Sequence, residues 1–509
     1  MIEQLECDVL VVGGGINGAA IARDAAGRGL RVVLCEKDDL GQHTSSASSK
    51  LVHGGLRYLE HLELAMVRKA LAEREVLLQS APHITRPLRF VMPHDAGQRP
   101  AWMIQAGLFL YDHLARRDFL PGSERIELLG HAAGAPLKPA YTHGFAYSDG
   151  WVEDARLVVL NAMDARERGA TILTHTLCSA VQRHAGHWSA TLMHAGRHML
   201  VEARCLVNAA GPWAARFLRD VPGAPTPPPL RLSKGSHIVV PRLFKHSYGY
   251  LFQHPDGRVV FALPFEEAFT LIGTTEVDYR GDLDALAISP EETAYLCQLV
   301  NRYFRRQVTP ADVVWSFSGV RPLVADPSRG AAATSRDFRL ATDSAGAPLL
   351  SVLGGKITTS RLLAEQAVDW IGPQLGKPAA AWTAQACLPG GDLFGERPSR
   401  RGVLEFDRWT AAQQRRYPWL EPALLVRYAR AYGTRIEAML ADCRAMDDLG
   451  AELVPGLYAV EAHYLMDKEW AASADDILWR RSRLGLHLPP GCVAQLDAWI
   501  GAREALPAW

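Results

Sequence analysis

A glycine-rich segment near the start of the chain has the spacing of a dinucleotide-binding turn. Residues 13–18 read GGGING and fit the pattern GxGxxG. In that pattern the first glycine makes the turn, the second lets the backbone approach a pyrophosphate, and the third allows close packing of helix on strand. The β-branched run CDVLVV precedes the segment and the alanine-rich stretch GAAIARDAAGRG follows it, so a helix N-terminus would stabilise the diphosphate charge. The candidate contacts are Gly13, Gly14, Gly15, Asn17 and Gly18.

An acid and two further loops narrow the choice of dinucleotide. The predicted strand RVVLCE ends on Glu36, about 20 residues after the glycines, where a carboxylate accepts a hydrogen bond from a ribose hydroxyl. This argues against NADP but does not separate NAD from FAD. The hydroxyl-rich loop Thr44–Lys50 is either an ordinary solvated loop or a wrapping for a diphosphate and a ribityl chain. The glycine turn at 353–359 could present backbone N–H groups to a flavin carbonyl, and the two loops together favour FAD.

The elements around these motifs indicate an α/β fold. Strand, glycine turn, helix and strand form a right-handed βαβ unit at the N-terminus, which predicts a parallel sheet. The pattern of strand, small-residue turn and helix recurs in ARCLVNAAGPWAARFL and in FRLATDSAGAPLLSVLGGKITTSRLLAEQAVDWI. Because these pieces are far apart in sequence, we expect a Rossmann-like FAD-binding domain with an inserted β-sheet substrate domain and a C-terminal helical cap. The expected ranges are 1–75, 146–230 and 331–387 for the FAD-binding domain, 76–145 and 231–330 for the substrate domain, and 397–509 for the helical domain.

Composition limits the class of protein. The 509 residues carry 55 basic and 55 acidic side chains, so the overall charge gives no reason to expect nucleic acid as a partner. The eight cysteines have no CxxC spacing, which argues against zinc, iron–sulfur ligation and a disulfide framework and predicts no metal site. The N-terminus enters a strand almost directly, without the features of an export signal, so we expect the mature chain to start here, in a reducing cytosol.

The segment Trp102–Leu114 is the nearest approach to a membrane element. Its apolar stretch is too short to span a bilayer and is interrupted by Asp112 and His113. A buried core helix and an interfacial helix with a basic rim are both open interpretations. The basic stretch RRYPWL at 415–420 is a second candidate for membrane contact.

Several longer stretches resemble the FAD-dependent glycerol-3-phosphate dehydrogenases, within the larger group of flavoproteins that includes D-amino-acid oxidase and glycine oxidase. They are VVGGGINGAAIARDAAGRG, TSSASSKLVHGGLRYLE, LVNAAGPW, KGSHIVVP, IGTTEVDY, WSFSGVRPL and LSVLGGKITTSR. The resemblance continues into the C-terminal EWAASADDILWRRSRLGLHL and so covers nearly the whole chain. One departure is TSRD at 334–337, which has an extra serine where the family usually reads Thr-Arg-Asp.

The resemblance implies a fold of the glutathione-reductase/D-amino-acid-oxidase type, non-covalent FAD, and oxidation of sn-glycerol 3-phosphate to dihydroxyacetone phosphate. It further implies that electrons pass to a respiratory quinone, in glycerol and glycerophospholipid catabolism. A homodimer bound peripherally to the cytoplasmic face of the cell membrane is also implied. The additional cofactor contacts that it implies are Thr44, Ser45, Ser46, Ser49, Lys50, Leu51, His53, Gly211, Gly354, Gly355, Lys356 and Thr358.

Oxidation of such a substrate needs cations for the phosphate, a base for the hydroxyl proton and a hydride acceptor. Arg321 and Arg336 are assigned to the phosphate, because a guanidinium binds its oxygens bidentately. Arg57 is placed near the hydroxyl end, where a fixed cation favours a developing alkoxide.

His237 and Lys356 complete the predicted catalytic set. His237, in KGSHIVV, is the candidate proton acceptor, although a lone histidine on an apolar strand is more often a hydrogen-bonded core residue. Lys356 is assigned to stabilise the anionic reduced flavin, and would act as a base only if neighbouring cations lowered its pKa.

Two rival functions remain open at this point. The first is an oxidase that passes electrons to oxygen, acting on glycerol 3-phosphate or on an amino acid. Several converging arginines favour a phosphate over an amino acid, whose single carboxylate needs only one. The second rival is a flavin-binding redox sensor without turnover, against which the intact Arg57, His237, Arg321 and Lys356 segments argue.

Overall fold

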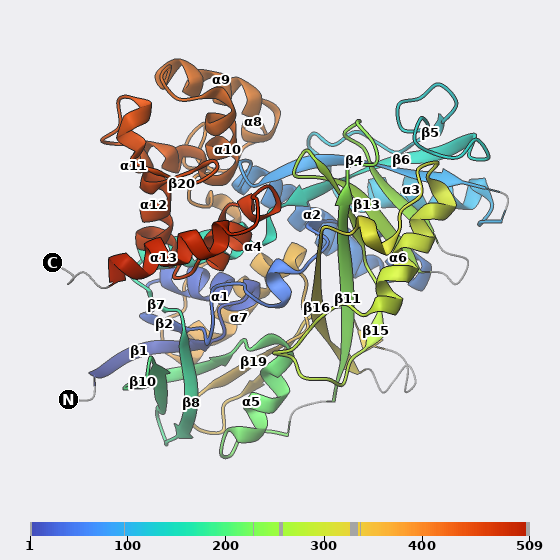
Figure 1. Ribbon diagram of the computed structural model, residues 1–509. Helices are drawn as coiled ribbons and strands as arrows, with labels where there is room; N and C mark the ends of the chain where they lie inside the picture. Colours follow the sequence, from blue (N-terminus) through green and yellow to red (C-terminus); the bar gives the residue numbers. More distant parts are fainter. Residues whose placement is uncertain are drawn as a thin grey trace.

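Two large β-sheets and a C-terminal group of helices make up the chain. The computed structural model describes residues 3–95, 97–226, 229–253, 258–325, 334–335 and 337–504. Figure 1 shows the first sheet at lower left, the second at right, and the C-terminal helices, in orange and red, above the first.

The first sheet contains the N-terminal βαβ unit. Its strands run in the order β18-β19-β10-β1-β2-β7, with β8 and β9 attached beside β10. β1 pairs in parallel with β2, as predicted from the N-terminal βαβ unit, and also in parallel with β10. The strands are β1 (Glu3–Val12), β2 (Val32–Cys35), β7 (Thr171–Leu173), β8 (Thr176–Arg183), β9 (Trp188–His194), β10 (Arg197–Asn208), β18 (Arg339–Asp343) and β19 (Leu349–Leu353).

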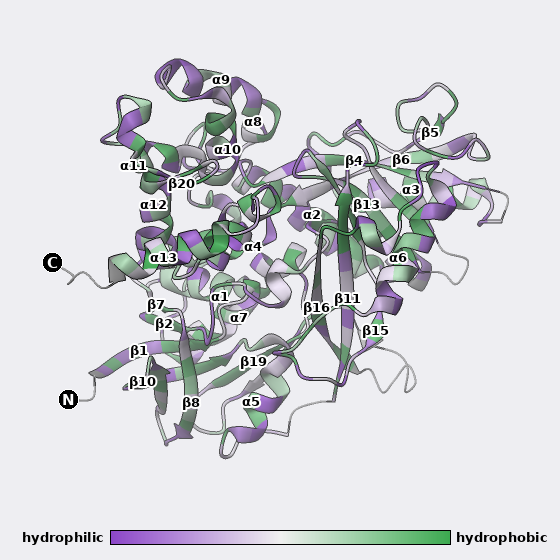
Figure 2. Ribbon diagram, viewed as in Figure 1, coloured by the Kyte–Doolittle hydropathy of each residue, from purple (hydrophilic) through white to green (hydrophobic). Residues whose placement is uncertain are grey.

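Helices cover this sheet and explain its apolar strands. Helix α1 (Ile16–Gly27) contacts both α4 (Asp154–Glu167) and α7 (Ser360–Gln374), while α5 (Ala214–Asp220) follows β10. Val9, Leu10 and Val11 are all fully buried, which is expected of a parallel strand that is covered on both faces. Figure 2 shows the contrast in hydropathy between buried and outer elements. Hydrophobic residues, in green, dominate the central strands, and hydrophilic residues, in purple, dominate the outer helix α9 (Phe406–Arg416).

The second sheet is larger and mostly antiparallel. Its order is β17-β16-β11-β14-β13-β12-β4-β6-β3, with β15 beside β11 and β5 beside β6. The strands are β3 (Leu51–Val52), β4 (Thr85–His94), β5 (Glu124–Glu127), β6 (His143–Val152), β11 (Leu230–Pro241), β12 (Gly249–Gln253), β13 (Val259–Phe265), β14 (Phe269–Gly273), β15 (Val277–Asp278), β16 (Trp315–Ala325) and β17 (Thr334–Ser335). Helices α2 (Leu64–Ser80), α3 (Ala101–His113) and α6 (Pro290–Tyr303) accompany it.

The C-terminal region is helical, as expected. It contains α8 (Arg400–Leu404), α9, α10 (Pro422–Tyr432), α11 (Ile436–Met439), α12 (Ala459–Glu469) and α13 (Cys492–Glu504), with the short strands β20 (Glu452–Val454) and β21 (Leu457–Tyr458). A single cluster of buried apolar residues runs from Val9 and Ile21 through α4 to Tyr428 and Leu478. The helical region therefore shares its core with the first sheet.

One sequence-based boundary was wrong, and one of the two interpretations of Trp102–Leu114 is excluded. Strand β6 crosses the expected boundary at residue 146 and lies entirely in the second sheet, because it pairs along its length with β4. Helix α3 is not a buried core helix, since only Ile104, Leu108 and Tyr111 of its thirteen residues are buried. Among the described residues, no helix has both the length and the apolar character needed to cross a bilayer.

Candidate functional site

A cavity of about 820 Å³ is lined by residues of both sheets. One end lies at the carboxyl ends of β1 and β2, and the other lies against β12, β13, β16 and α3. Most of the predicted site residues line it: Gly13, Gly15, Asn17, Glu36, Thr44, Ser45, Ser49, Leu51, His53, Arg57, Gly211, Arg321, Gly354, Gly355, Lys356 and Thr358. Arg336 lies outside the described residues.

The glycine turn fits a closely approaching nucleotide. Gly13 has a φ of +113°, and a Cβ there would lie 2.5 Å from the carbonyl oxygen of Ala209. A Cβ on Gly18 would lie 1.9 Å from the carbonyl oxygen of Gly13, so this third glycine serves helix packing and does not line the cavity. Gly15 lines the cavity at the start of α1, where unpaired helical N–H groups attract an anion.

Glu36 lines the same end of the cavity as the glycine turn. Its Oε2 accepts a hydrogen bond from the Gly14 N–H at 2.6 Å, and its Oε1 accepts one from the Asp38 N–H at 3.0 Å. Burial raises the pKa of this carboxyl above its usual range. Glu36, Asp38 and His43 have ligand atoms within 4.8 Å of one another, but His43 and Asp38 already share a 2.7 Å hydrogen bond. Glu36 and His43 also line the cavity, so the cluster lies at the same end as the glycine turn.

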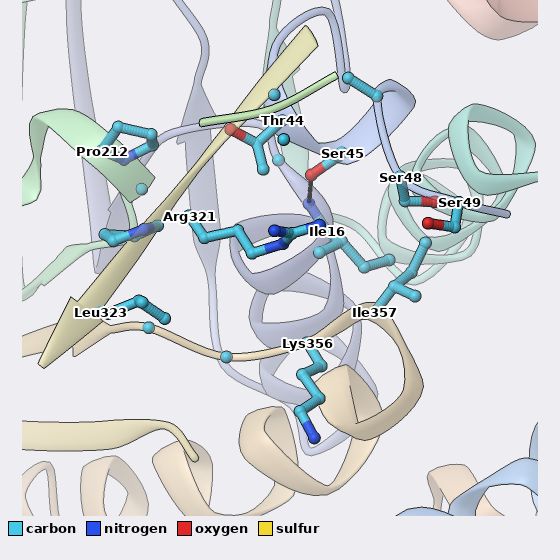
Figure 3. A pocket seen from close by; sticks show the side chains of 18 of the residues that line it. Ile16, Thr44, Ser45, Ser48, Ser49, Pro212, Arg321, Leu323, Lys356 and Ile357 are labelled. Atoms are coloured by element: carbon cyan, nitrogen blue, oxygen red, sulfur yellow. Dashed lines mark hydrogen bonds between the residues drawn. The ribbon is translucent and has the colours of Figure 1, made fainter. Parts of the chain in front are cut away.

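The hydroxyl-rich loop lines the middle of the cavity, but two of its residues do not face it. The Ile16 N–H donates to Ser45 Oγ at 3.0 Å, the dashed line in Figure 3. Lys50 is fully buried and its ammonium donates to both Asp154 oxygens at 2.9 Å, so it supports the loop from behind. Ser46 likewise does not line the cavity, because its hydroxyl donates to the carbonyls of Gln42 and His43.

The far end of the cavity gathers the cationic side chains. Arg321 extends from β16 into the cavity, where Nη2 lies 3.4 Å from Thr274 Oγ1 (Figure 3). Lys356 points in another direction, with Nζ 3.9 Å from the centre of the Tyr58 ring. Arg57 Nη1 lies 3.9 Å from Glu276 Oε2. Arg57, Arg321 and Lys356 therefore line the same cavity from different elements, although Lys356 points away from Arg321.

The two histidines of the predicted site differ in position. His53 lines the cavity, and burial together with the charges of Lys356, Arg74 and Arg321 lowers its pKa to about 3. His237 does not line it: its ring is 1% exposed and stacks on Phe317 at 4.8 Å. Burial, Arg321 and Lys50 hold the pKa of His237 well below its usual range.

Some cavity residues were not predicted from the sequence. Among these are Ser48, Tyr58, Gln253, Arg258 and Glu276. Ser48 lies in the hydroxyl-rich loop and Tyr58 in the stretch TSSASSKLVHGGLRYLE, but neither was assigned a contact from the sequence. Asn17 Oδ1 is buried and has no hydrogen-bond partner among the described residues, while its Nδ2 donates to Gly354 O at 3.3 Å. A group bound in the cavity could supply the missing donor.

Comparisons with known proteins agree with this arrangement. Residues 8–361 match the family model of FAD dependent oxidoreductases, and residues 381–498 match the C-terminal domain of alpha-glycerophosphate oxidase. The glycerol-3-phosphate dehydrogenase of Pseudomonas aeruginosa is 51% identical over 97% of this chain and 94% of its own length. The aerobic glycerol-3-phosphate dehydrogenase of Escherichia coli is 46% identical over 97% of both chains.

Two further relatives bear on cofactor and substrate. The D-erythritol 1-phosphate dehydrogenase of Brucella abortus is 46% identical over 98% of this chain and 99% of its own length. The solved structure of a glycerol-3-phosphate dehydrogenase from Bacillus halodurans, complexed with FAD, is 25% identical and superposes with a TM-score of 0.77, covering 98% of this chain and 90% of that one.

Proposed function

The chain belongs to the family of FAD-dependent glycerol-3-phosphate dehydrogenases, and from this premise we propose that it oxidises sn-glycerol 3-phosphate to dihydroxyacetone phosphate and passes the electrons to a respiratory quinone. The observation that supports the proposal best is the position of Arg321, His53 and Lys356 in the same cavity as the dinucleotide turn. We assign this reaction to glycerol and glycerophospholipid catabolism.

FAD is the cofactor, and the cavity contains residues suited to hold it. Glu36 would accept a ribose hydroxyl, the start of α1 would face the diphosphate, and Ser45 and Ser49 would line the path to the far end. When bound, the flavin supplies the hydride acceptor of the reaction. The protein's own side chains would bind the phosphate and remove the hydroxyl proton.

Arg321 is the proposed phosphate ligand. It lines the far end of the cavity, and a guanidinium matches phosphate oxygens in a bidentate fork. Arg57 would lie nearer the hydroxyl, where a fixed positive charge favours a developing alkoxide. Arg336 stays a sequence-based prediction for the same phosphate, since it lies outside the described residues.

We propose His53 as the group that takes the hydroxyl proton. It lines the cavity, whereas His237 lies behind Ser49 and would need Ser49 to carry a proton between them. Burial, and after it the surrounding cations, lowers the pKa of His53 to about 3; a bound phosphate dianion would oppose the effect of the cations and raise the pKa of His53. Lys356 is assigned to stabilise the negative charge of the reduced flavin.

A peripheral association with the cytoplasmic face of the cell membrane is proposed from α3. Trp102 and Phe109 are 69% and 64% exposed there, and the neighbouring Leu62 is 80% exposed. Met103, Ile104 and Gly107 of the same helix line the cavity. A lipid-facing α3 would thus bring an apolar quinone beside the site, which supports the choice of acceptor. A homodimer remains a sequence-based prediction.

Anaerobic flavin reduction tests the reaction. Glycerol 3-phosphate added to the FAD-loaded protein should bleach the long-wavelength flavin absorbance, and a soluble quinone should restore it. Absence of bleaching would reject the substrate, and recovery with oxygen alone, with one peroxide formed per substrate, would favour the oxidase alternative.

D-erythritol 1-phosphate is a second candidate substrate. The relative that bears this name is as similar to the chain as the Escherichia coli glycerol-3-phosphate dehydrogenase is, at 46% identity. Both substrates carry a phosphate and a secondary alcohol, so the same arginine and histidine would serve either. Comparing kcat/KM for the two compounds decides between them, and we expect the larger value for glycerol 3-phosphate.

A further inference from the structure

Three arginines of the C-terminal region contact loops of the FAD-binding site. Arg480 and Arg481 end a π-helical segment, Asp476–Arg481, and Arg483 follows in a left-handed conformation with a φ of 57°. They lie within WRRSRLGL, a stretch to which the reaction described above assigns no role. Besides nearer partners, they contact Asp39 and Asp154, which are 329 to 442 residues away in the sequence.

Arg480 and Arg481 converge on Asp39. Arg481 donates through Nη1 to Asp39 Oδ2 at 2.8 Å and through Nη2 to Asp39 Oδ1 at 2.7 Å, and Arg480 Nε donates to Oδ2 at 2.6 Å. The side chains of Asp39 and Arg481 are both fully buried. Such a bidentate, charge-assisted pair fixes the position of its carboxylate.

Asp39 anchors the loop that follows the nucleotide-binding acid. It comes three residues after Glu36, and its N–H donates to Gln42 Oε1 at 3.1 Å. Glu36, Gly41 and Gln42 all line the cavity. The two arginines therefore hold the loop that forms the adenosine end of the site.

Arg483 reaches the hydroxyl-rich loop through a second set of partners. Its Nη2 donates to Asp154 Oδ1 at 3.0 Å, and its Nε lies 2.6 Å from Glu153 Oε2. Asp154 in turn accepts hydrogen bonds from Ser48 Oγ at 2.8 Å and from Lys50 Nζ at 2.9 Å. Ser48 and its neighbour Ser49 line the cavity.

We infer that three arginines act together to position FAD, namely Arg480, Arg481 and Arg483. They hold two loops at the same time: the loop that follows Glu36, at the adenosine end of the site, and the hydroxyl-rich loop. These arginines need not touch the cofactor. They act through Asp39, whose buried charge would otherwise be unpaired, and through Asp154, which Arg483 holds together with Lys50 and Ser48. The helical C-terminal region is then part of the cofactor site as well as a cap. This inference rests on FAD binding and is independent of the identity of the substrate.

The experiment measures FAD binding by apoprotein apart from turnover. Arg483→Gln apoprotein is titrated with FAD while the quenching of flavin fluorescence is followed, and the thermal midpoint of the same apoprotein is recorded. We expect the dissociation constant for FAD to rise by about 10- to 100-fold, by analogy with the loss of a residue that supports the ligands of a metal ion. Arg483→Lys, which keeps the charge, should recover most of the affinity.

Arg427→Gln is the matched control. Arg427 forms a bidentate pair with the buried Glu461, at 2.6 Å through both Nη atoms, and its hydrogen-bond partners among the described residues, Glu461 and Gly456, both lie within the C-terminal region. Its loss should lower the thermal midpoint and leave FAD affinity within about twofold, because the cofactor loops keep their contacts. If the two glutamine variants lose the same stability and retain the same FAD affinity, the positioning role is wrong.

A milder variant covers the case in which Arg483→Gln does not fold. Arg480 is 13% exposed and shares Asp39 with Arg481, so Arg480→Gln leaves that carboxylate paired. We expect a weaker affinity for FAD, by about three- to tenfold, with little change in the thermal midpoint. Unchanged FAD affinity in this variant would overturn the inference for the Asp39 contacts.

Discussion

The hydroxyl of Ser49 lies 2.9 Å from Nε2 of His237, with Ser49 lining the cavity and the histidine behind it. The imidazole is closely packed on its other sides, since a Cβ on Gly273 would lie 1.9 Å from its Cδ2. His237 therefore contacts Ser49 from behind the cavity wall, whereas the side chain of His53 lines the cavity itself.

Replacing His53 by Asn should lower the rate of flavin reduction by about 100- to 10,000-fold, the usual cost of losing a general base. The measurement is single-turnover reduction in a stopped-flow instrument at saturating FAD and substrate. His237→Asn should cost less than about tenfold in the same assay, because the ring acts only through Ser49. A larger loss for His237→Asn than for His53→Asn would return the base to His237 and contradict our assignment.

Replacing Arg321 by Gln should raise KM for glycerol 3-phosphate by about 10- to 100-fold, the range for one charge-assisted hydrogen bond. kcat should change much less if the contact is equally strong in the ground and transition states. Steady-state kinetics with a soluble quinone measures both constants. The control is Arg231→Gln on the adjacent strand β11, where the side chain is 42% exposed and paired with Asp278. An unchanged KM for Arg321→Gln would remove this residue from the phosphate site.

Replacing Gly14 by Ala should weaken FAD binding by about tenfold or more. A Cβ at this position would lie 2.7 Å from Cβ of Glu36, and it would push the carboxylate away from the Gly14 N–H and out of its place. FAD titration of the apoprotein measures the effect. Gly186→Ala is the control, because nothing lies within 4 Å of a Cβ there. Equal FAD affinity in the two variants would mean that the close packing of Gly14 on Glu36 is dispensable.

Local sequence signals identified segments that the structure brings together at one end of the cavity. The glycine turn, Glu36 and the hydroxyl-rich loop all follow from short motifs, because a βαβ unit brings the carboxyl ends of its strands to one edge. Strand alternation could not tell whether His237 would face the cavity or the core, since its neighbours on β11 are buried as well. The contacts of Arg481 and Arg483 join residues more than 300 positions apart, and no local pattern encodes such pairs.

Acid should destabilise the protein between pH 7 and pH 5. Burial lowers the pKa of His83 to about 3 and that of His237 well below its usual value, and both rings are 1% exposed. Below the ordinary histidine pKa of about 6.5 the unfolded chain takes up protons that the folded chain does not, so stability is present above that pH and is lost as the pH falls. Each fully buried histidine could cost up to about 2 kcal/mol at pH 5.

The thermal midpoint of the apoprotein at the two pH values measures this loss. His83→Asn should lower the midpoint at pH 7 through poorer packing but should narrow the difference between pH 7 and pH 5. Exposed His113 provides the control, and His113→Asn should leave the difference as it is in the parent protein. If the change in thermal midpoint between pH 7 and pH 5 is the same in the parent protein, His83→Asn and His113→Asn, then His83 does not contribute to the acid sensitivity.

Replacing Phe109 by Glu should weaken binding to anionic phospholipid vesicles by about tenfold. Phe109 is 64% exposed on α3, and a glutamate there removes apolar area from the lipid and adds repulsion from anionic headgroups. Leu404→Glu is matched in exposure, at 62%, but lies on α8 in the C-terminal region, so we expect it to bind vesicles as the parent protein does. Cosedimentation with vesicles measures binding, and flavin reduction by glycerol 3-phosphate should be equal in all three proteins, since neither side chain lines the cavity. If Phe109→Glu binds vesicles normally and Leu404→Glu does not, the membrane-facing surface is on the helical region and the quinone must reach the flavin by another route than α3.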